Sequence, residues 1–209
     1  AAATGYLNQL AEGWRYALAR QQLRAAVIFA GIGALAGRSV LETLPILANG
    51  VFGQGPPGLG YMTAAAGAGA AAASIFKAVS RPQIPGEFQP QILAMPVIIP
   101  LLVAAFAMIG DFATAVAAVA LVGATVTLMS ISLQSTVQME IEDQYRGRVM
   151  GLWTTISIGS GAAGAVLMGF LVDLVGVAPA QLMIGLLLAA ASILVLLLFR
   201  RGLSQPDAR

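Results

Sequence analysis

The sequence predicts an all-α membrane protein with six transmembrane helices. Hydrophobic residues make up 58% of its 209 residues and charged residues only 10%, whereas a soluble domain carries roughly 25% charged residues. The apolar residues gather in six long runs, each near the roughly 20 residues that a helix needs to span a bilayer. The Lys and Arg residues fall almost entirely on alternate connections between these runs, as expected for helices that cross a membrane in alternating directions.

The predicted spans follow one another with short connections. They lie at 23–48, 58–79, 90–110, 112–134, 149–172 and 179–199. Together they make a transmembrane domain over residues 23–199, with a linker of residues 1–22 before it and a tail of residues 200–209 after it.

The linker is predicted to lie on the cytoplasmic surface of the membrane. Leu7, Leu10 and Trp14 recur at helical spacing, which predicts an interfacial helix over residues 6–20; a linker without regular structure is the alternative. The chain begins without Met and without the ordered regions of a signal peptide. We therefore expect it to be part of a longer protein.

Basic residues indicate how the spans are oriented. The connections after the first, third and fifth spans contain no Lys or Arg. Every basic residue except Arg38 lies at or before the start of the first span, in the 77–89 loop, in the 138–148 loop or in the tail. Because cytoplasmic loops carry the excess of Lys and Arg, we predict a multi-pass protein of the plasma (inner) membrane with both termini cytoplasmic. That orientation requires an even number of spans.

The composition excludes several classes of function. The chain has no Cys and no His, so disulfides, thiolate or imidazole metal sites and Ser-His or Cys-His nucleophiles cannot form. We expect no enzyme activity, no cofactor and no metal. The net charge of +2 is spread between apolar runs, which favours a lipid bilayer over nucleic acid as a partner.

Polar content divides the spans into two kinds. The third and sixth are almost pure hydrocarbon, as expected of helices that face lipid, whereas the other four contain many Gly, Ser and Thr residues, which occur where helices pack together or line a cavity. Two inner helices and one outer helix thus occur twice. Because each triplet has an odd number of spans, the second is inverted. A 3+3 inverted repeat is expected of one half of a major facilitator superfamily (MFS) transporter.

Two segments resemble that superfamily directly. Residues 133–176, which begin LQSTVQMEIEDQYRGRVMG, resemble the loop between the tenth and eleventh helices and the eleventh helix of MFS exporters, especially the branch of the enterobactin exporter and related drug-efflux permeases. Residues 44–70 resemble their seventh and eighth helices. The family's signature loop, Gly-x-Leu-x-Asp-Arg-x-Gly, is replaced here by FKAVSRPQIPGE. The resemblance implies a C-terminal half whose partner is a missing N-terminal six-helix half; a second copy of the chain is the alternative.

The fifth span contains four glycines that are candidates for close helix packing. They are Gly159, Gly161, Gly164 and Gly169. Small residues are common at helix interfaces in membranes, so we favour packing over a role as a bending element.

The charged loop before the fifth span is a candidate cytoplasmic gate. Its ionisable residues are Glu140, Glu142, Asp143, Arg146 and Arg148. Ion pairs among them would hold the cytoplasmic side closed and would break when two halves rock. A solvated charged loop is the alternative, because exposed ion pairs contribute only about 0–1 kcal/mol each.

Hydroxyl and amide side chains in the fourth and fifth spans are candidate contacts with a small-molecule substrate. They are Ser130, Gln134, Thr154 and Ser157. Each hydroxyl taken alone is better explained by a hydrogen bond to a carbonyl of its own helix, but the set predicts a hydrated interior.

Arg38 and Glu42 interrupt the first span near its middle. A charge at the bilayer centre costs several kcal/mol, and residues four apart share one helical face. A structural ion pair is the alternative; we favour a functional role in which both residues face a central cavity. Arg38 stays protonated and can hold an anionic or polar group, whereas Glu42 can exchange a proton.

Together these features predict half of a secondary active transporter that exports small amphipathic or drug-like molecules by alternating access, driven by a proton gradient. The alternative is a non-transporting six-helix scaffold, or a sensory or assembly protein. Such a protein would not need polar faces on four of its spans.

Overall fold

The computed structural model describes residues 15–16, 19–80 and 90–203. Most of the predicted interfacial helix, most of the 77–89 loop and the end of the tail lie outside the described residues.

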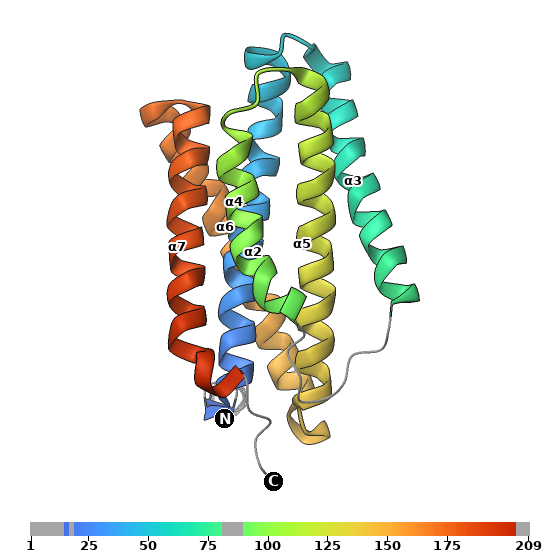
Figure 1. The fold of residues 1–209 in the computed structure, drawn as a ribbon, viewed down its shortest axis with the longest axis vertical. Helices are drawn as coiled ribbons and strands as arrows, with labels where there is room; N and C mark the ends of the chain where they lie inside the picture. The colour runs from blue at the N-terminus through green and yellow to red at the C-terminus, as the bar shows by residue number, and fades with distance from the viewer. Residues whose placement is uncertain (1–14, 17–18, 81–89, 204–209) are drawn as a thin grey trace, which may run out of the picture.

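Within this part of the chain, six α-helices run up and down in one bundle (Figure 1). They are α2 (Gln21–Ile46), α3 (Gly55–Val79), α4 (Pro90–Phe106), α5 (Phe112–Glu140), α6 (Asp143–Val175) and α7 (Val177–Leu203), and a π-helical turn, η1 (Leu47–Val51), continues α2. The first residues of α2 and the last residues of α7 lie at the same end of the bundle (Figure 1). The prediction of an all-α fold is confirmed for the described residues.

Five of these helices are long and apolar enough to cross a membrane. They are Gln21–Val51, Gly55–Val79, Phe112–Glu140, Asp143–Val175 and the Val177–Phe199 part of α7. The apolar stretch of α4, Leu93–Phe106, is shorter, because turns follow Phe106 and Asp111 already caps α5. A multi-pass membrane protein is therefore confirmed, although the third predicted span does not reach the length of the others.

α5 and α6 extend beyond their apolar runs into the charged segment between them. α5 ends at Glu140 and α6 begins at Asp143, so most of the predicted 138–148 loop is helical. Asp143 lies in the first turn of α6, where a negative charge interacts favourably with the helix dipole.

α2 is the central helix of the bundle. Half of its most apolar window is buried, against 17–28% for the other four spans, and it contacts α3, α4, α5, α6 and α7. The most extensive helix pairs are α3 with α5, α2 with α6 and α4 with α7. In Figure 1, α3 and α7 lie at opposite edges of the molecule.

Small residues allow α3 and α5 to pack backbone against backbone. A β-carbon built at Gly69 would lie 1.9 Å from the carbonyl oxygen of Ala120, and one built at Gly123 would lie 2.4 Å from that of Ala66. No side chain fits at either glycine without separating the two helices. The Gly and Ala content of the inner spans therefore sets how closely these helices approach.

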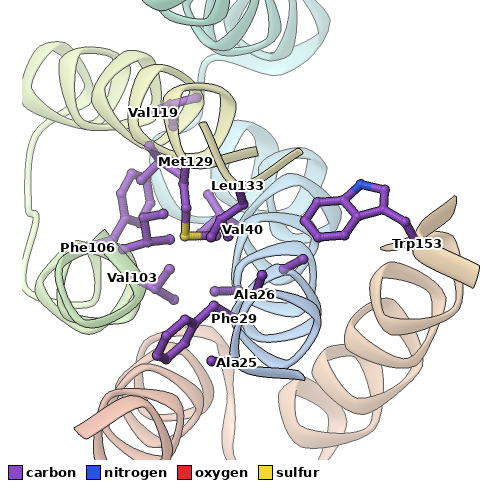
Figure 2. Close-up of a cluster of buried hydrophobic side chains, with 14 of the residues drawn as sticks. Ala25, Ala26, Phe29, Val40, Val103, Phe106, Val119, Met129, Leu133 and Trp153 are labelled. Carbon is purple, nitrogen blue, oxygen red and sulfur yellow. The ribbon is translucent and has the colours of Figure 1, made fainter. Parts of the chain in front are cut away.

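The main apolar core surrounds α2. Phe29 of α2, Val103 of α4 and Met129 of α5 are almost fully buried and belong to one cluster. Figure 2 shows these side chains on one side of α2 and Trp153 of α6 on another. Because the core holds α2 from several directions, it fixes which face of α2 is left for polar residues.

Candidate functional site

A cavity of about 980 Å³ lies between α2, α3, α5 and α6. Most of its lining is Ala, Gly, Val, Leu and Ile, and its polar side chains are Arg38, Thr63, Thr127 and Ser157. None of the lining residues in the described part of the chain belongs to α4 or α7, the two helices that contain the hydrocarbon-rich spans. The four helices with polar and small residues thus form the cavity wall.

Arg38 and Glu42 form an ion pair on the face of α2. The Nε atom of Arg38 lies 2.8 Å from Oε1 of Glu42, and the two side chains are 54% and 41% exposed. Arg38 and Leu41 line the cavity, whereas Glu42 lies just outside its lining. A β-carbon built at Gly161 of α6 would lie 3.9 Å from the side chain of Arg38, so the stem of Arg38 passes beside this glycine.

The regular helix breaks soon after this ion pair. Pro45 lies inside α2, and in η1 the N–H of Phe52 donates to the carbonyl oxygen of Leu47 at 2.9 Å. Proline removes a hydrogen bond from a helix, and single π-helical turns occur frequently at functional sites. The proline predicts an irregularity here, whereas the π-helical turn has no sequence signature.

The predicted substrate contacts are not all at the cavity. Ser157 lines it. Ser130 is exposed and Gln134 is half-buried on α5, and neither lines the cavity. Thr154 also lies outside the lining and donates its hydroxyl to the carbonyl oxygen of Met150 at 3.0 Å. The structure therefore brings Ser157 together with Arg38 and leaves the other three apart.

Two threonines line the cavity beyond the predicted set. They are Thr63 of α3 and Thr127 of α5; the Thr63 hydroxyl donates to the carbonyl oxygen of Leu59 at 2.8 Å. Both occur in spans that the sequence marks as inner. What separates Thr127 from Ser130 and Gln134 on the same helix is the direction in which α5 faces its neighbours, and that direction is set by packing.

The four glycines of α6 fall into two pairs. Gly161 lines the cavity, and Gly164 packs on α2, where a β-carbon would lie 2.7 Å from the carbonyl oxygen of Leu35. Gly159 and Gly169 are exposed, and a β-carbon at either would meet no atom within 4 Å.

Arg20 connects the segment before α2 to the short connection between α5 and α6. Its Nη2 atom lies 2.7 Å from Oε1 of Glu142, and its Nη1 atom donates to the carbonyl oxygen of Glu140 at 3.1 Å. Nη1 also donates to the hydroxyl of Tyr16, whose ring stacks on Tyr145 with 4.3 Å between centroids. We call Tyr16, Arg20, Glu142 and Tyr145 the Arg20 cluster.

The predicted gate residues are placed around this cluster. Asp143 and Arg146 pair with each other along α6, with 3.0 Å between Oδ1 and Nη2, and both are exposed. The guanidinium of Arg148 lies 6.0 Å from the ring centroid of Tyr145, and Glu140 contributes its backbone carbonyl. Arg20 is the contact that the sequence does not single out, because a lone basic residue in a linker forms no pattern.

Two carboxyl groups outside the spans have pKa values below the ordinary range. Hydrogen bonds from Gln144 and Arg20 lower the pKa of Glu142. Hydrogen bonds from the side chain and backbone of Thr114 lower the pKa of Asp111, the N-cap of α5. Both groups are therefore ionised at neutral pH, and Asp111 satisfies a free N–H of the first turn of α5.

The fold and the cavity define a multi-pass membrane protein in which four helices line an open cavity, with Arg38 of the ion pair in its wall. Residues 3–207 match the MFS family described as transmembrane secretion effector, and the chain belongs to this family. The family is one of transporters, so the coarse prediction of an MFS-type membrane transporter is confirmed. Comparison with curated proteins and with solved structures gives no match.

Proposed function

We propose that this chain is the C-terminal half of a secondary active exporter of small amphipathic or drug-like molecules. The observation that carries the proposal is the cavity between α2, α3, α5 and α6, because its mostly apolar wall also holds Arg38. Ligand sites of this kind combine apolar walls with a few placed polar groups. An amphipathic molecule would bury its apolar part against the Ala and Val side chains, and its acidic or polar group would contact Arg38.

Alternating access requires a second wall, which supports the assignment to one half. Tyr61, Ile75 and Phe76 of α3 and Val166 and Phe170 of α6 are exposed apolar side chains on two helices that border the cavity. A second six-helix unit placed over these helices would bury those side chains and close the cavity. We favour an N-terminal half of the same protein as that unit, and a second copy of this chain is the alternative.

The helix contacts support the inverted repeat. In an inverted repeat α2 corresponds to α5, α3 to α6 and α4 to α7. Under this correspondence the contact of α3 with α5 becomes that of α6 with α2, and the contact of α4 with α7 stays the same. All three contacts are extensive. Substrate sites of MFS transporters lie near the midplane between such repeats, and Arg38 is near the middle of the long α2–η1 helix.

Proton coupling is assigned to Glu42. Arg38 keeps its charge in any surroundings, whereas a carboxyl group can bind and release a proton. In this structure the carboxylate of Glu42 is paired with Arg38 at 2.8 Å. Rocking of the two halves would separate Arg38 from Glu42. Arg38 would then contact substrate in one state and pair with Glu42 in the other.

We place the protein in the plasma (inner) membrane with both termini in the cytoplasm. The Arg20 cluster and the predicted gate residues would then lie on the cytoplasmic side, at the same end as the basic residues at the start of α2. In the state that is closed to the cytoplasm, the contact of Arg20 with Glu142 would hold the residues before α2 against α5 and α6. Rocking of the two halves would break this contact.

The test is dye transport in proteoliposomes that contain the complete protein to which this chain belongs. With an imposed proton gradient, at least one dye from a panel of anionic amphipathic dyes should be transported, and Arg38→Ala should abolish that flux. The chain alone, verified as a monomer by crosslinking, should give none. Absence of gradient-driven flux for the whole panel would favour the scaffold alternative, and flux through the monomeric chain would contradict the assignment to one half.

A further inference from the structure

A buried hydrogen bond joins α7 to the side of α2 that faces away from the cavity. The side chains of Gln181 and Thr43 are each only 1% exposed. Nε2 of Gln181 donates to Oγ1 of Thr43 at 2.9 Å, and the Thr43 hydroxyl in turn donates to the carbonyl oxygen of Val40 at 2.7 Å. Gln181 is thus a polar contact from a helix whose span is otherwise almost pure hydrocarbon.

The position of Thr43 relative to Arg38 gives this bond its significance. Five residues separate them, so at about 100° per residue Thr43 lies about 140° around α2 from Arg38. A rotation of α2 that moved Arg38 out of the cavity would pull Thr43 away from Gln181. It would leave a buried amide without its partner, which is unfavourable.

The bond also lies at a place where α2 needs an external support. Pro45 has no N–H to donate to the carbonyl oxygen of Leu41, and the π-helical turn η1 follows, so the hydrogen bonding that keeps a helix straight is interrupted around Glu42. A contact from α7 at Thr43 supports the turn of α2 that carries Glu42.

We propose that Gln181 is a positioning residue, whose hydrogen bond to Thr43 adds to the apolar core in fixing the rotation of α2 and thereby keeps Arg38 in the cavity wall and Glu42 beside it. The role of Arg38 and Glu42 in transport rests on the proposed function. The orientation of α2 does not depend on that function, so it can be measured without a transport assay.

The experiment measures the chemical accessibility of two cavity positions in the purified chain. The chain has no native Cys, so Leu41→Cys on α2 and Thr63→Cys on α3 each provide a single thiol at the cavity. Each is combined with Gln181→Leu, with Thr43→Val, with both, or with Thr43→Ser, which keeps the acceptor oxygen. The rate of reaction with a water-soluble methanethiosulfonate reagent is then recorded, together with the melting temperature.

Gln181→Leu and Thr43→Val should each change the rate at Leu41→Cys by about fivefold, which corresponds to about 1 kcal/mol for one net hydrogen bond. The rate at Thr63→Cys should stay constant, because α3 does not take part. Thr43→Ser should keep both rates at their original values. The double variant leaves no amide unpaired, so it should regain melting temperature while the rate at Leu41→Cys stays altered.

A role in folding alone gives a different result. In that case the double variant restores the rate at Leu41→Cys along with the melting temperature, or the rates at both thiols change together, or neither changes; each of these outcomes overturns the proposal. Because accessibility is read without substrate, a failure of the proposed transport function leaves the result of this experiment intact.

Discussion

Gly164 of α6 lies directly against the backbone of α2, so that a β-carbon at this position would sit 2.7 Å from the carbonyl oxygen of Leu35. Gly164→Ala should therefore push the two helices apart and destabilise the fold by about 1–3 kcal/mol, as overpacking generally does. Thermal unfolding in detergent measures the effect.

Gly169 provides a matched control on the same helix. A β-carbon there meets no atom within 4 Å, and Ala is favoured over Gly in a helix by about 1 kcal/mol. Gly169→Ala should leave the melting temperature unchanged or raise it slightly. Equal destabilisation by both substitutions would mean that the effect of Gly164→Ala does not come from the contact between α2 and α6.

Stability should depend on pH through the Arg20 cluster. The pKa of Glu142 lies below its ordinary value of 4.5 because Gln144 and Arg20 donate hydrogen bonds to the carboxylate. A lowered folded-state pKa means that the contribution of Glu142 is complete above the ordinary pKa and is lost as the pH falls through the folded-state value.

The comparison of the original chain with Glu142→Gln tests this dependence. The original chain should melt at a higher temperature at neutral pH, and the difference should disappear as the solution is acidified below pH 4.5. A difference that stays constant over the whole pH range would show that the ionised carboxylate is not responsible. Arg20→Gln should reduce this pH-dependent difference without abolishing it, since it deletes the charged partner of Glu142 and leaves the hydrogen bond from Gln144 in place.

Residue types in a span indicated its surroundings well. Whether a run of about 20 residues faces lipid or protein depends on a sum over many side chains, and that sum can be read without knowing any contact. The division into inner and outer spans was therefore predictable, and it agrees with the helices that line the cavity. The ion pair of Arg38 and Glu42 was predictable for a similar reason, since spacing along one helix determines it.

Contacts between helices were not predictable in the same way. Thr127 lines the cavity and Gln134 does not, although both are polar residues of α5. Gln181 is one polar residue in an apolar span, and its partner Thr43 is 138 residues away in the sequence. The rotation of each helix about its own axis decides such pairs, and that rotation results from tertiary packing rather than from local sequence.

The orientation in the membrane can be tested with single thiols because the chain has no native Cys. Cys introduced at Ser80 or Gln144 should be protected from an impermeant reagent applied outside intact cells, since both positions adjoin basic residues that favour the cytoplasmic side. Cys at Met108, an 84% exposed residue between α4 and α5, should react. Labelling at Ser80 or Gln144 together with protection of Met108 would reverse the proposed topology.

The ion pair on α2 leads to the prediction that bears most directly on mechanism. In the complete transporter, Glu42→Gln should fold and bind substrate but lose proton-driven flux, because Gln keeps the size of the side chain and cannot carry a proton. Flux driven by a substrate gradient alone should persist in this variant. Measurement of both fluxes in proteoliposomes separates coupling from binding.

A structural ion pair predicts a different pattern across the variants. Each single substitution would then leave one charge without its partner and impair folding, whereas the double variant Arg38→Gln with Glu42→Gln would fold and regain full proton-driven transport. We expect the reverse for transport: the double variant should remain uncoupled and should also bind anionic substrates more weakly, because Arg38 supplies the cation at the cavity wall. Normal proton-driven transport by Glu42→Gln would rule out Glu42 as the coupling site.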